Sequence, residues 1–179
     1  MVLAVHSDAS YLNEENARSR AGGHHFLSEN VSLPPSNGAI HNVAKIIKGV
    51  MSSAAEVKLG AMYSNARKAV EERIILQEMG HKQPTTPVQV DNSTAEGIVN
   101  KRVQPKRTKA MDMRFHWLRY HWILNQFQYC WRPGSTNYAN YWTKHHPAAH
   151  HWNMRSIFLT PFIQLLEFRK AQISTARVC

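Results

Sequence analysis

Short apolar runs alternate with one long helical pattern along this chain, and their order predicts an α/β fold. The first run, residues 2–7, is rich in Val and Leu, which suits a strand buried on both faces and closed by Asp8. A polar connector over residues 13–23 and a turn region over residues 29–38 separate it from predicted strands at 24–28 and 39–47. Three consecutive strands joined by turns indicate an antiparallel meander.

The longest helical pattern begins after Ser52 and Ser53, which are both residue types that cap helix N-termini. Its apolar positions recur at helical spacing and predict one buried stripe, made of Leu59, Met62, Tyr63, Ala66, Ala69 and Val70. We expect this helix to end near Gly80.

The second half of the chain repeats the alternation of strands and helices. A fourth strand ends in Asp91, and a fifth contains the alternating aromatic residues of "QFQYCWR". The predicted elements are a strand at 86–91, a short helix at 92–101, a helix from 108 to about 122, a strand at 126–132 and a helix at 135–144.

Composition narrows the class of partner. The 179 residues suffice for one domain with a core plus a tail, and 43% are apolar, so the chain should fold. A net charge of +10 favours a polyanionic partner, nucleic acid before an anionic membrane surface. The chain has two cysteines, no apolar run of about 20 residues and no signal peptide. These features predict an intracellular protein, cytoplasmic or nuclear, that is neither secreted nor inserted in a membrane.

Five blocks, in order and at compatible spacing, resemble the ribonuclease H domain of copia-type retrotransposon polyproteins. They are "HSDAS", "MSSAAEVKL", "VDNSTA", "KAMDMRFHWLR" and "YANYWTK". Each block alone is a weak signal, whereas five in the right order are a strong one. The resemblance covers residues 2–146 and predicts a domain over 1–146, with a tail over 147–179, partly of helical pattern, outside it.

The resemblance implies a mixed five-stranded sheet of strand order 3-2-1-4-5, flanked by helices. It also implies hydrolysis of the RNA strand of an RNA/DNA hybrid by two Mg²⁺ ions, which prefer carboxylate oxygens as ligands. In a complete element, a reverse transcriptase domain would lie upstream. Because Met1 directly precedes the first strand, we expect this chain to be a detached fragment or a relic.

The family uses four acidic residues, and two of the matching positions here are not acidic. Asp8 and Asp91 match the first and third acids, whereas Asn140 stands in place of the fourth. The second lies in a helix motif with two acids, whose first matches Glu56 and whose second, the usual ligand, matches Lys58. The predicted catalytic positions are therefore Asp8, Lys58, Asp91 and Asn140, and the predicted metal ligands are Asp8, Glu56 and Asp91.

Helix geometry does not choose between Glu56 and Lys58. At about 100° per residue they point about 200° apart, so only one of them can face the metals. With Lys58 there, the charge of the site falls from −4 to −1, and the ammonium would pair with Asp8 or Asp91 in the place of a cation. We therefore expect impaired catalysis. A simpler interpretation is that Asp8 and Asp91 are ordinary residues at strand ends. Glu56 would then be a solvated acid at the start of a helix.

A basic stretch begins after the third block, with "KRVQPKRTK", and continues into the helix that follows. Its cations are Lys101, Arg102, Lys106, Arg107, Lys109 and Arg114. They could contact phosphates along a duplex or hybrid, or form a solvated charged link. The leading prediction is thus an impaired ribonuclease H-like domain, and the alternatives are a nucleic-acid-binding module without catalysis or a functionless retroelement fragment.

Overall fold

The computed structural model describes residues 1–31, 34–100 and 113–159, and it forms a mixed five-stranded sheet. The strands are β1 (Val2–Glu14), β2 (Arg18–Ser28), β3 (Ala39–Ile47), β4 (Thr86–Val90) and β5 (Phe127–Trp131). Their order is β3-β2-β1-β4-β5, with β1–β2 and β2–β3 antiparallel and β1–β4 and β4–β5 parallel. The predicted fold class and strand order are confirmed.

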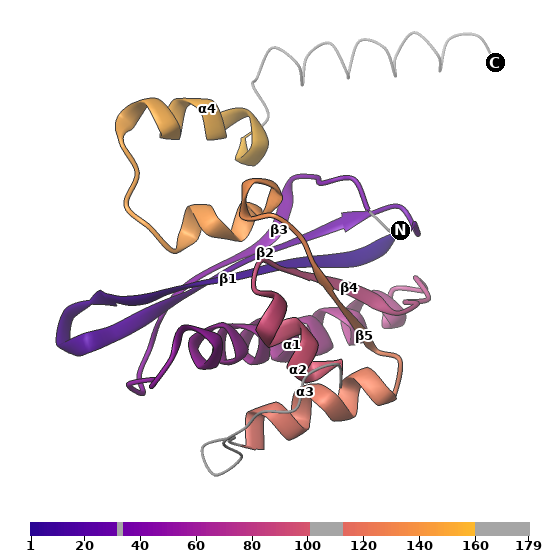
Figure 1. The fold of residues 1–179 in the computed structure, drawn as a ribbon. Coiled ribbons are helices and arrows are strands. Elements are labelled where there is room, and N and C mark those ends of the chain that lie inside the picture. The colour runs from indigo at the N-terminus through magenta and orange to yellow at the C-terminus, as the bar shows by residue number, and fades with distance from the viewer. Residues whose placement is uncertain (32–33, 101–112, 160–179) are drawn as a thin grey trace, which may run out of the picture. The chain divides into compact units, whose positions relative to one another are not determined.

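Three α-helices cover one face of this sheet (Figure 1). They are α1 (Ala54–Glu78), α2 (Ser93–Val99) and α3 (Met113–Ile123). The predicted stripe of α1 is confirmed: Leu59, Met62, Ala66 and Ala69 are buried in the main core, and Tyr63 and Val70 pack against it. Leu3, Val5, Val88 and Tyr129 come from the sheet to the same core, so the helical and strand periodicities meet in one layer.

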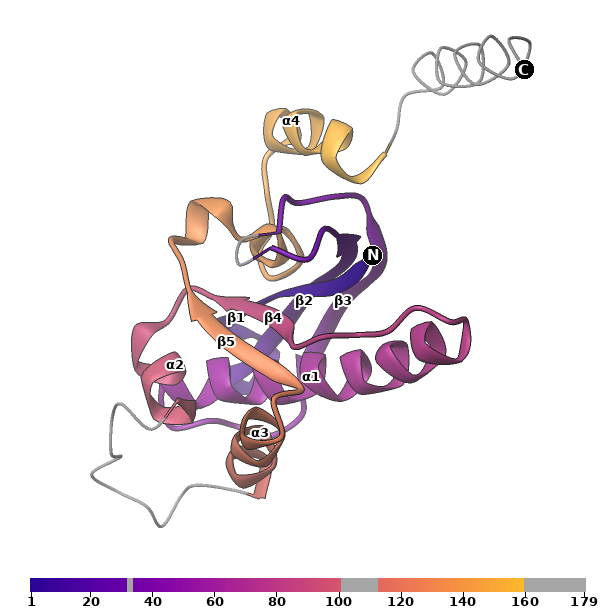
Figure 2. The same ribbon diagram turned by 90° about the vertical axis from the view of Figure 1, so that its right-hand side faces the viewer.

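Short 3-10 helices follow β5 and lie against the other face of the sheet (Figure 2). They are η3 (Gly134–Thr136) and η4 (Tyr138–Trp142), where a single α-helix over 135–144 was predicted. Asn137 explains the difference. Its backbone is extended, its side chain accepts from Ala139 N at 3.1 Å, and it donates to Ser7 O at 3.0 Å. These bonds compete with helical ones and anchor the segment to β1.

The predicted connector over residues 13–23 is wrong, because β1 and β2 form one long hairpin joined by η1 (Glu15–Ala17). Asn16 and Ala17 adopt positive φ there and reverse the chain. Pairing of β1 with β2 runs through Asp8, which faces Gly22, so Asp8 does not close the strand as predicted. Backbone pairing requires no apolar side chains, so the hydrophobic pattern did not predict strands at the polar tip of the hairpin.

Two compact units divide the chain, Met1–His145 and His146–Cys179. The second contains α4 (Ala148–Phe158). The boundary predicted between residues 146 and 147 stays a prediction. None of the helices in the described ranges combines the length and the apolarity that a bilayer crossing demands.

Candidate active site

The candidate site forms where β1 and β4 part. The two strands pair through Val5–Val88 and His6–Gln89. Beyond this pairing β1 continues in its ladder with β2, whereas β4 ends at Val90. Asp8 lies two residues further along β1, and Asp91 directly follows β4. The first turns of α1 pass the same end and bring Lys58 to it. The structure therefore brings together three of the four predicted catalytic positions.

Lys58 bridges the two carboxylates. Its Nζ donates to Asp8 Oδ1 and, at 2.6 Å, to Asp91 Oδ1. The side chain of Asp8 is almost fully buried, whereas those of Lys58 and Asp91 are 16% and 19% exposed. One ammonium thus neutralises half of the negative charge at the site and occupies the space between the two acids.

Electrostatics keep Asp8 and Lys58 charged. Burial raises the pKa of Asp8, but the charge and hydrogen bond of Lys58, together with hydrogen bonds from Thr143 and the Ala9 backbone, outweigh burial and hold that pKa below its usual value. Burial lowers the pKa of Lys58, and Asp8 with Asp91 more than reverse that effect, so the Lys58 pKa lies above its usual value. The site is a stable ion triplet of net charge −1.

Thr143 also contributes to the site, and it was not predicted as a site residue. Its buried hydroxyl donates to Asp8 Oδ2 at 2.7 Å, and the backbone O of Asn140, 2.9 Å away, is a second acceptor that shares its single proton. Both oxygens of Asp8 are therefore engaged, one by an ammonium and one by a hydroxyl. Thr143 falls in the "YANYWTK" block, so its place in the pattern was the available signal.

Asn140 lies beside the triplet without joining it. Its Nδ2 donates to Gly134 O at 2.8 Å, and its Oδ1 accepts from Lys144 Nζ at 3.0 Å. A Cβ on Gly134 would lie 3.2 Å from Asn140 Nδ2 and 3.3 Å from Asp91 Oδ2, so both side chains flank this glycine. The amide is thus near Asp91, but its oxygen is already held by a lysine.

Glu56 points away from the acids and caps its own helix. Ser53 Oγ accepts from Glu56 N at 3.2 Å, while the Glu56 carboxylate accepts from Ser52 N at 2.8 Å and Ser52 Oγ at 2.7 Å. This is a capping box shifted by one residue, and it satisfies donors that a helix start leaves open. Among the predicted metal ligands, Asp8 and Asp91 share the Lys58 ammonium, whereas the Glu56 carboxylate is bonded to Ser52.

The described residues do not fit a pair of Mg²⁺ ions. Magnesium needs anionic or neutral oxygen ligands with free lone pairs, and an ammonium offers none. Asp8 and Asp91 supply −2, Lys58 returns +1, and the Asn140 oxygen is neutral and already accepts from Lys144. Two divalent ions would face a net charge of −1, with a cation between the two available carboxylates.

A basic groove of about 400 Å³ opens between β3 and the middle of α1. Its lining carries five cations and one acid, namely Lys45, Lys48, Arg67, Lys68, Arg114 and Glu71. Glu71 pairs with Lys68 at 2.8 Å, so the groove keeps a surplus of positive charge. Of the predicted phosphate-contacting residues, only Arg114 is described, and it lines this groove. Lys101, Arg102, Lys106, Arg107 and Lys109 lie outside the described residues.

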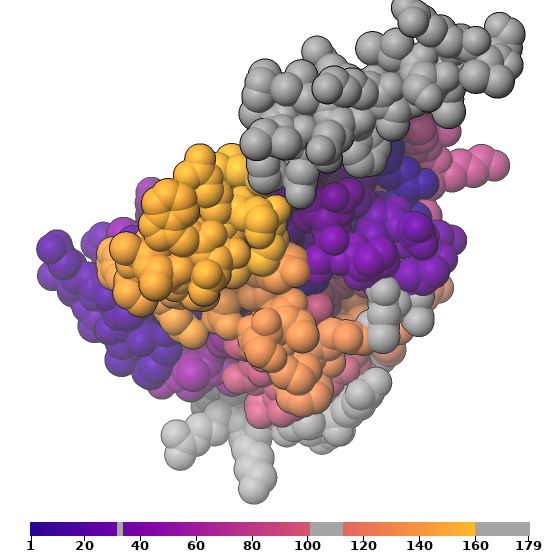
Figure 3. Space-filling model, turned by 90° about the horizontal axis from the view of Figure 1, so that it is seen from above, coloured from indigo at the N-terminus to yellow at the C-terminus, as the bar shows by residue number. Residues whose placement is uncertain are grey.

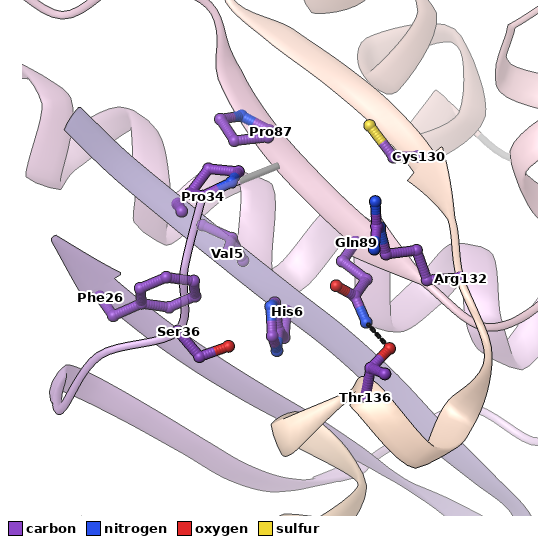
Figure 4. A pocket seen from close by; sticks show the side chains of 11 residues that line it. Val5, His6, Phe26, Pro34, Ser36, Pro87, Gln89, Cys130, Arg132 and Thr136 are labelled. Carbon is purple, nitrogen blue, oxygen red and sulfur yellow. Dashed lines mark hydrogen bonds between the residues drawn. The ribbon is translucent and has the colours of Figure 1, made fainter. Parts of the chain in front are cut away.

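A smaller cavity, of about 140 Å³, opens on the other face of the sheet (Figure 4). His6 and Phe26 line it from β1 and β2, and Gln89 Nε2 donates across it to Thr136 Oγ1 at 3.0 Å. Pro34 and Ser36 of the β2–β3 connection close it, and Figure 3 shows this purple connection beside the orange segment that follows β5. Burial, with the nearby charges of His24 and Arg132, lowers the pKa of His6 to about 3.

Comparison with known proteins agrees with this architecture. No protein-family model matches the chain. It is 27% identical over 118 residues to the retrovirus-related Pol polyprotein from transposon TNT 1-94 of Nicotiana tabacum, a match that covers 66% of this chain and only 8% of that polyprotein.

Solved structures that resemble it include ribonucleases H. The RNase H1 named LC11, isolated from compost by a metagenomic approach, superposes with a TM-score of 0.57 at 9% identity, covering 79% of this chain and 91% of that one. The N-terminal RNase H domain of a Mycobacterium tuberculosis protein gives 0.55 at 12% identity, covering 79% and 90%. LC11 in complex with an RNA/DNA hybrid gives 0.54 at 13% identity, covering 79% and 93%. At these identities the likeness shows the fold. The chain therefore has a ribonuclease H-like fold, and part of its sequence is similar to a retrotransposon Pol polyprotein.

Proposed function

We propose that this chain is a ribonuclease H-like domain in which hydrolysis of RNA/DNA hybrids is impaired. The observation that carries the proposal is the Lys58 ammonium, which contacts Asp8 and lies 2.6 Å from Asp91. The ancestral reaction would need divalent ions at this place to stabilise the attacking and leaving oxygens. An ammonium tethered between the two acids competes with such ions and cannot itself bind a water or a phosphate oxygen as a Lewis acid.

The test combines Mg²⁺ titration by calorimetry with cleavage of a labelled RNA/DNA hybrid. We expect no saturable binding of Mg²⁺ that depends on Asp8, and no more cleavage than the Asp8→Asn variant gives. Asp8→Asn is a suitable reference because it keeps the shape of the side chain and removes its charge. Metal-dependent cleavage by the wild type that is lost in Asp8→Asn would overturn the proposal.

A second function, nucleic-acid binding without catalysis, is favoured by the basic groove. Lys45, Lys48 and Arg67 are exposed along it, and the net charge of the chain is +10. Phosphate contacts of this kind bind duplexes without reading sequence. The LC11 relative of the fold was solved with an RNA/DNA hybrid, which supports a hybrid or duplex as the ligand. In a complete element, a reverse transcriptase domain upstream would supply such a hybrid.

Binding at two salt concentrations separates the candidate functions. Salt-dependent binding of a hybrid without cleavage supports the binding module. If the chain neither binds nor cleaves the hybrid, the remaining interpretation is a retroelement fragment that no longer has either activity.

A further inference from the structure

A second group of polar side chains converges about the middle of α1, away from the Asp8–Lys58–Asp91 triplet. His25 on β2 lies directly opposite His41 on β3 in the antiparallel ladder, so both imidazoles are on the same face of the sheet. Glu72 of α1 reaches down to the pair. The ladder shifts register between His25 and Phe26, leaving Ile40 as an extra residue next to His41. Such bulges re-aim neighbouring side chains.

Both histidines turn the same kind of atom toward one carboxylate. His25 Nδ1 lies 2.7 Å from Glu72 Oε2, and His41 Nδ1 lies 2.7 Å from Glu72 Oε1. Burial raises the pKa of Glu72, but the hydrogen bonds and charges of the two histidines outweigh burial and hold that pKa below its usual value. Glu72 is therefore an ionised carboxylate that faces two imidazole nitrogens.

The second ring nitrogen of His25, Nε2, faces the side chain of Asn65. Asn65 Nδ2 donates to Ser7 Oγ and to Gly22 O, each at 2.9 Å, which leaves Asn65 Oδ1 as an acceptor 3.5 Å from His25 Nε2. The carbonyl of Gly22 can only accept, so the orientation of this amide is settled by its partners. Without an ion, a proton on His25 Nδ1 serves the 2.7 Å contact with Glu72. When Nδ1 binds a metal instead, the proton moves to Nε2, where Asn65 Oδ1 can accept it.

Two imidazole nitrogens thus converge on one carboxylate, and either a proton on each Nδ1 or a single metal ion can lie between them. We propose that His25, His41 and Glu72 bind a divalent transition-metal ion, and that Zn²⁺ is the ion that suits them best. This inference is independent of the proposed function, because the three residues are separate from the Asp8–Lys58–Asp91 triplet.

The ligand set has the chemistry of known zinc sites. Two imidazole nitrogens and one carboxylate are common zinc ligands, whereas Mg²⁺ and Ca²⁺ prefer oxygen alone. The ligand atoms lie within 4.8 Å of one another, and tetrahedral ligands about 2.0–2.2 Å from an ion are about 3.5 Å apart, so a small outward shift admits the ion. Asn65 then acts as the partner that orients a metal-bound histidine through its second nitrogen.

Exposure leaves room for a fourth ligand. The His25 side chain is fully buried, that of Glu72 is 14% exposed and that of His41 is 36% exposed. A water molecule can complete the tetrahedron from the side of His41. The ion would tie β2 and β3 to α1, so its expected role is to stabilise the fold.

The test measures Zn²⁺ binding by the full chain, freed of metal, with calorimetry and thermal unfolding, and uses the visible spectrum of Co²⁺ as a report of tetrahedral coordination. We expect the wild type to bind Zn²⁺, to unfold at a higher temperature with it, and to give tetrahedral Co²⁺ bands. His41→Ala and Glu72→Gln should each weaken this binding at least about tenfold and abolish the thermal shift. Glu72→Gln keeps the size of the side chain, and His41 lies near the surface, so both variants should fold.

A control variant, His150→Ala with His151→Ala, removes two histidines of α4 that could bind Zn²⁺ adventitiously. It should keep the thermal shift and the Co²⁺ bands. Equal Zn²⁺ binding by the wild type and His41→Ala would overturn the proposal. So would a wild type whose unfolding temperature is unchanged by Zn²⁺, since the hydrogen bonds of the two histidines with Glu72 would then account for the cluster alone.

Discussion

The Lys58 ammonium lies 2.6 Å from the Asp91 carboxylate, although 33 positions of sequence separate the two residues. The helix α1 and the end of strand β4 meet there, and the same ammonium also contacts Asp8 on the central strand. Under the proposed function, this contact puts a fixed cation where divalent ions would have to bind. Stability and impaired catalysis are therefore predicted to depend on the same residue.

Removing the Lys58 charge should destabilise the protein. Lys58→Met keeps much of the aliphatic stem but leaves the buried Asp8 carboxylate facing Asp91 without compensation. We expect the free energy of unfolding at pH 7 to fall by about 3 kcal/mol, as for other broken buried pairs. The loss should shrink in acid, where Asp8 becomes protonated. Chemical denaturation across pH measures both effects.

Lys68→Met is the matched control on the same helix, because the Lys68–Glu71 pair is more than half exposed. Exposed pairs contribute little to stability, so this variant should unfold almost as the wild type does. Equal losses in the two variants would contradict the role assigned to Lys58.

Restoring the missing acids should restore metal binding. Lys58→Glu combined with Asn140→Asp brings four carboxylates to the site, which repel one another until Mg²⁺ binds. We expect this variant to unfold at a lower temperature than the wild type without Mg²⁺ and to be stabilised by adding it. Hybrid cleavage should rise at least about tenfold, which corresponds to about 1.4 kcal/mol of activation free energy. Adding Asp8→Asn should abolish the gain, and a gain that survives would point to a contaminating nuclease.

His6 should make the protein less stable in mild acid. Its pKa is about 3 in the folded chain and about 6.5 when unfolded, so the unfolded state binds the extra proton between these values. The free energy of unfolding should therefore fall as the pH drops below 6.5, with a slope from His6 of about 1.4 kcal/mol per pH unit. Denaturation at a series of pH values measures the slope.

His6→Asn is the comparison, because an amide oxygen can replace His6 Nδ1 as the acceptor of the bond from Tyr138 N, which is 3.2 Å long in the structure. Its absolute stability will differ, but its slope between pH 4 and 6 should be smaller by about the contribution of one proton. An unchanged slope would show that His6 titrates normally in the folded protein.

The basic groove should determine the salt dependence of nucleic-acid binding. If Lys45 and Lys48 each contact a phosphate, Lys45→Gln with Lys48→Gln should reduce the slope of log affinity against log salt by about 1.8 on duplex DNA. Fluorescence anisotropy at several salt concentrations measures this slope. Lys82→Gln removes an exposed charge after α1, outside the groove, and should change the slope much less. Equal changes in both variants would indicate binding by net charge alone.

The hydrophobic pattern predicted the sheet and its helices because the period of two and the period of 3.6 are local properties of the chain. It could not predict that β1 continues past Asp8, since the hairpin tip is held by backbone pairing between polar residues. It also could not exclude an α-helix at 135–144, where Asn137 breaks the helix by bonding to β1. In both segments a partner distant in sequence decides the local structure.

The sequence by itself determined which acids survive: Asp8 and Asp91 are present, and Lys58 and Asn140 stand where the resemblance expects two more. Only the tertiary structure decided that Lys58 bridges both acids while Glu56 bonds to Ser52. The two residues point about 200° apart on the helix, and which of them faces the acids depends on the side of the helix that packs against the sheet. The cluster of His25, His41 and Glu72 likewise depends on strand register and on the position of α1. The sequence specifies the identity of each side chain, whereas the distances between charged groups are set only when the chain folds.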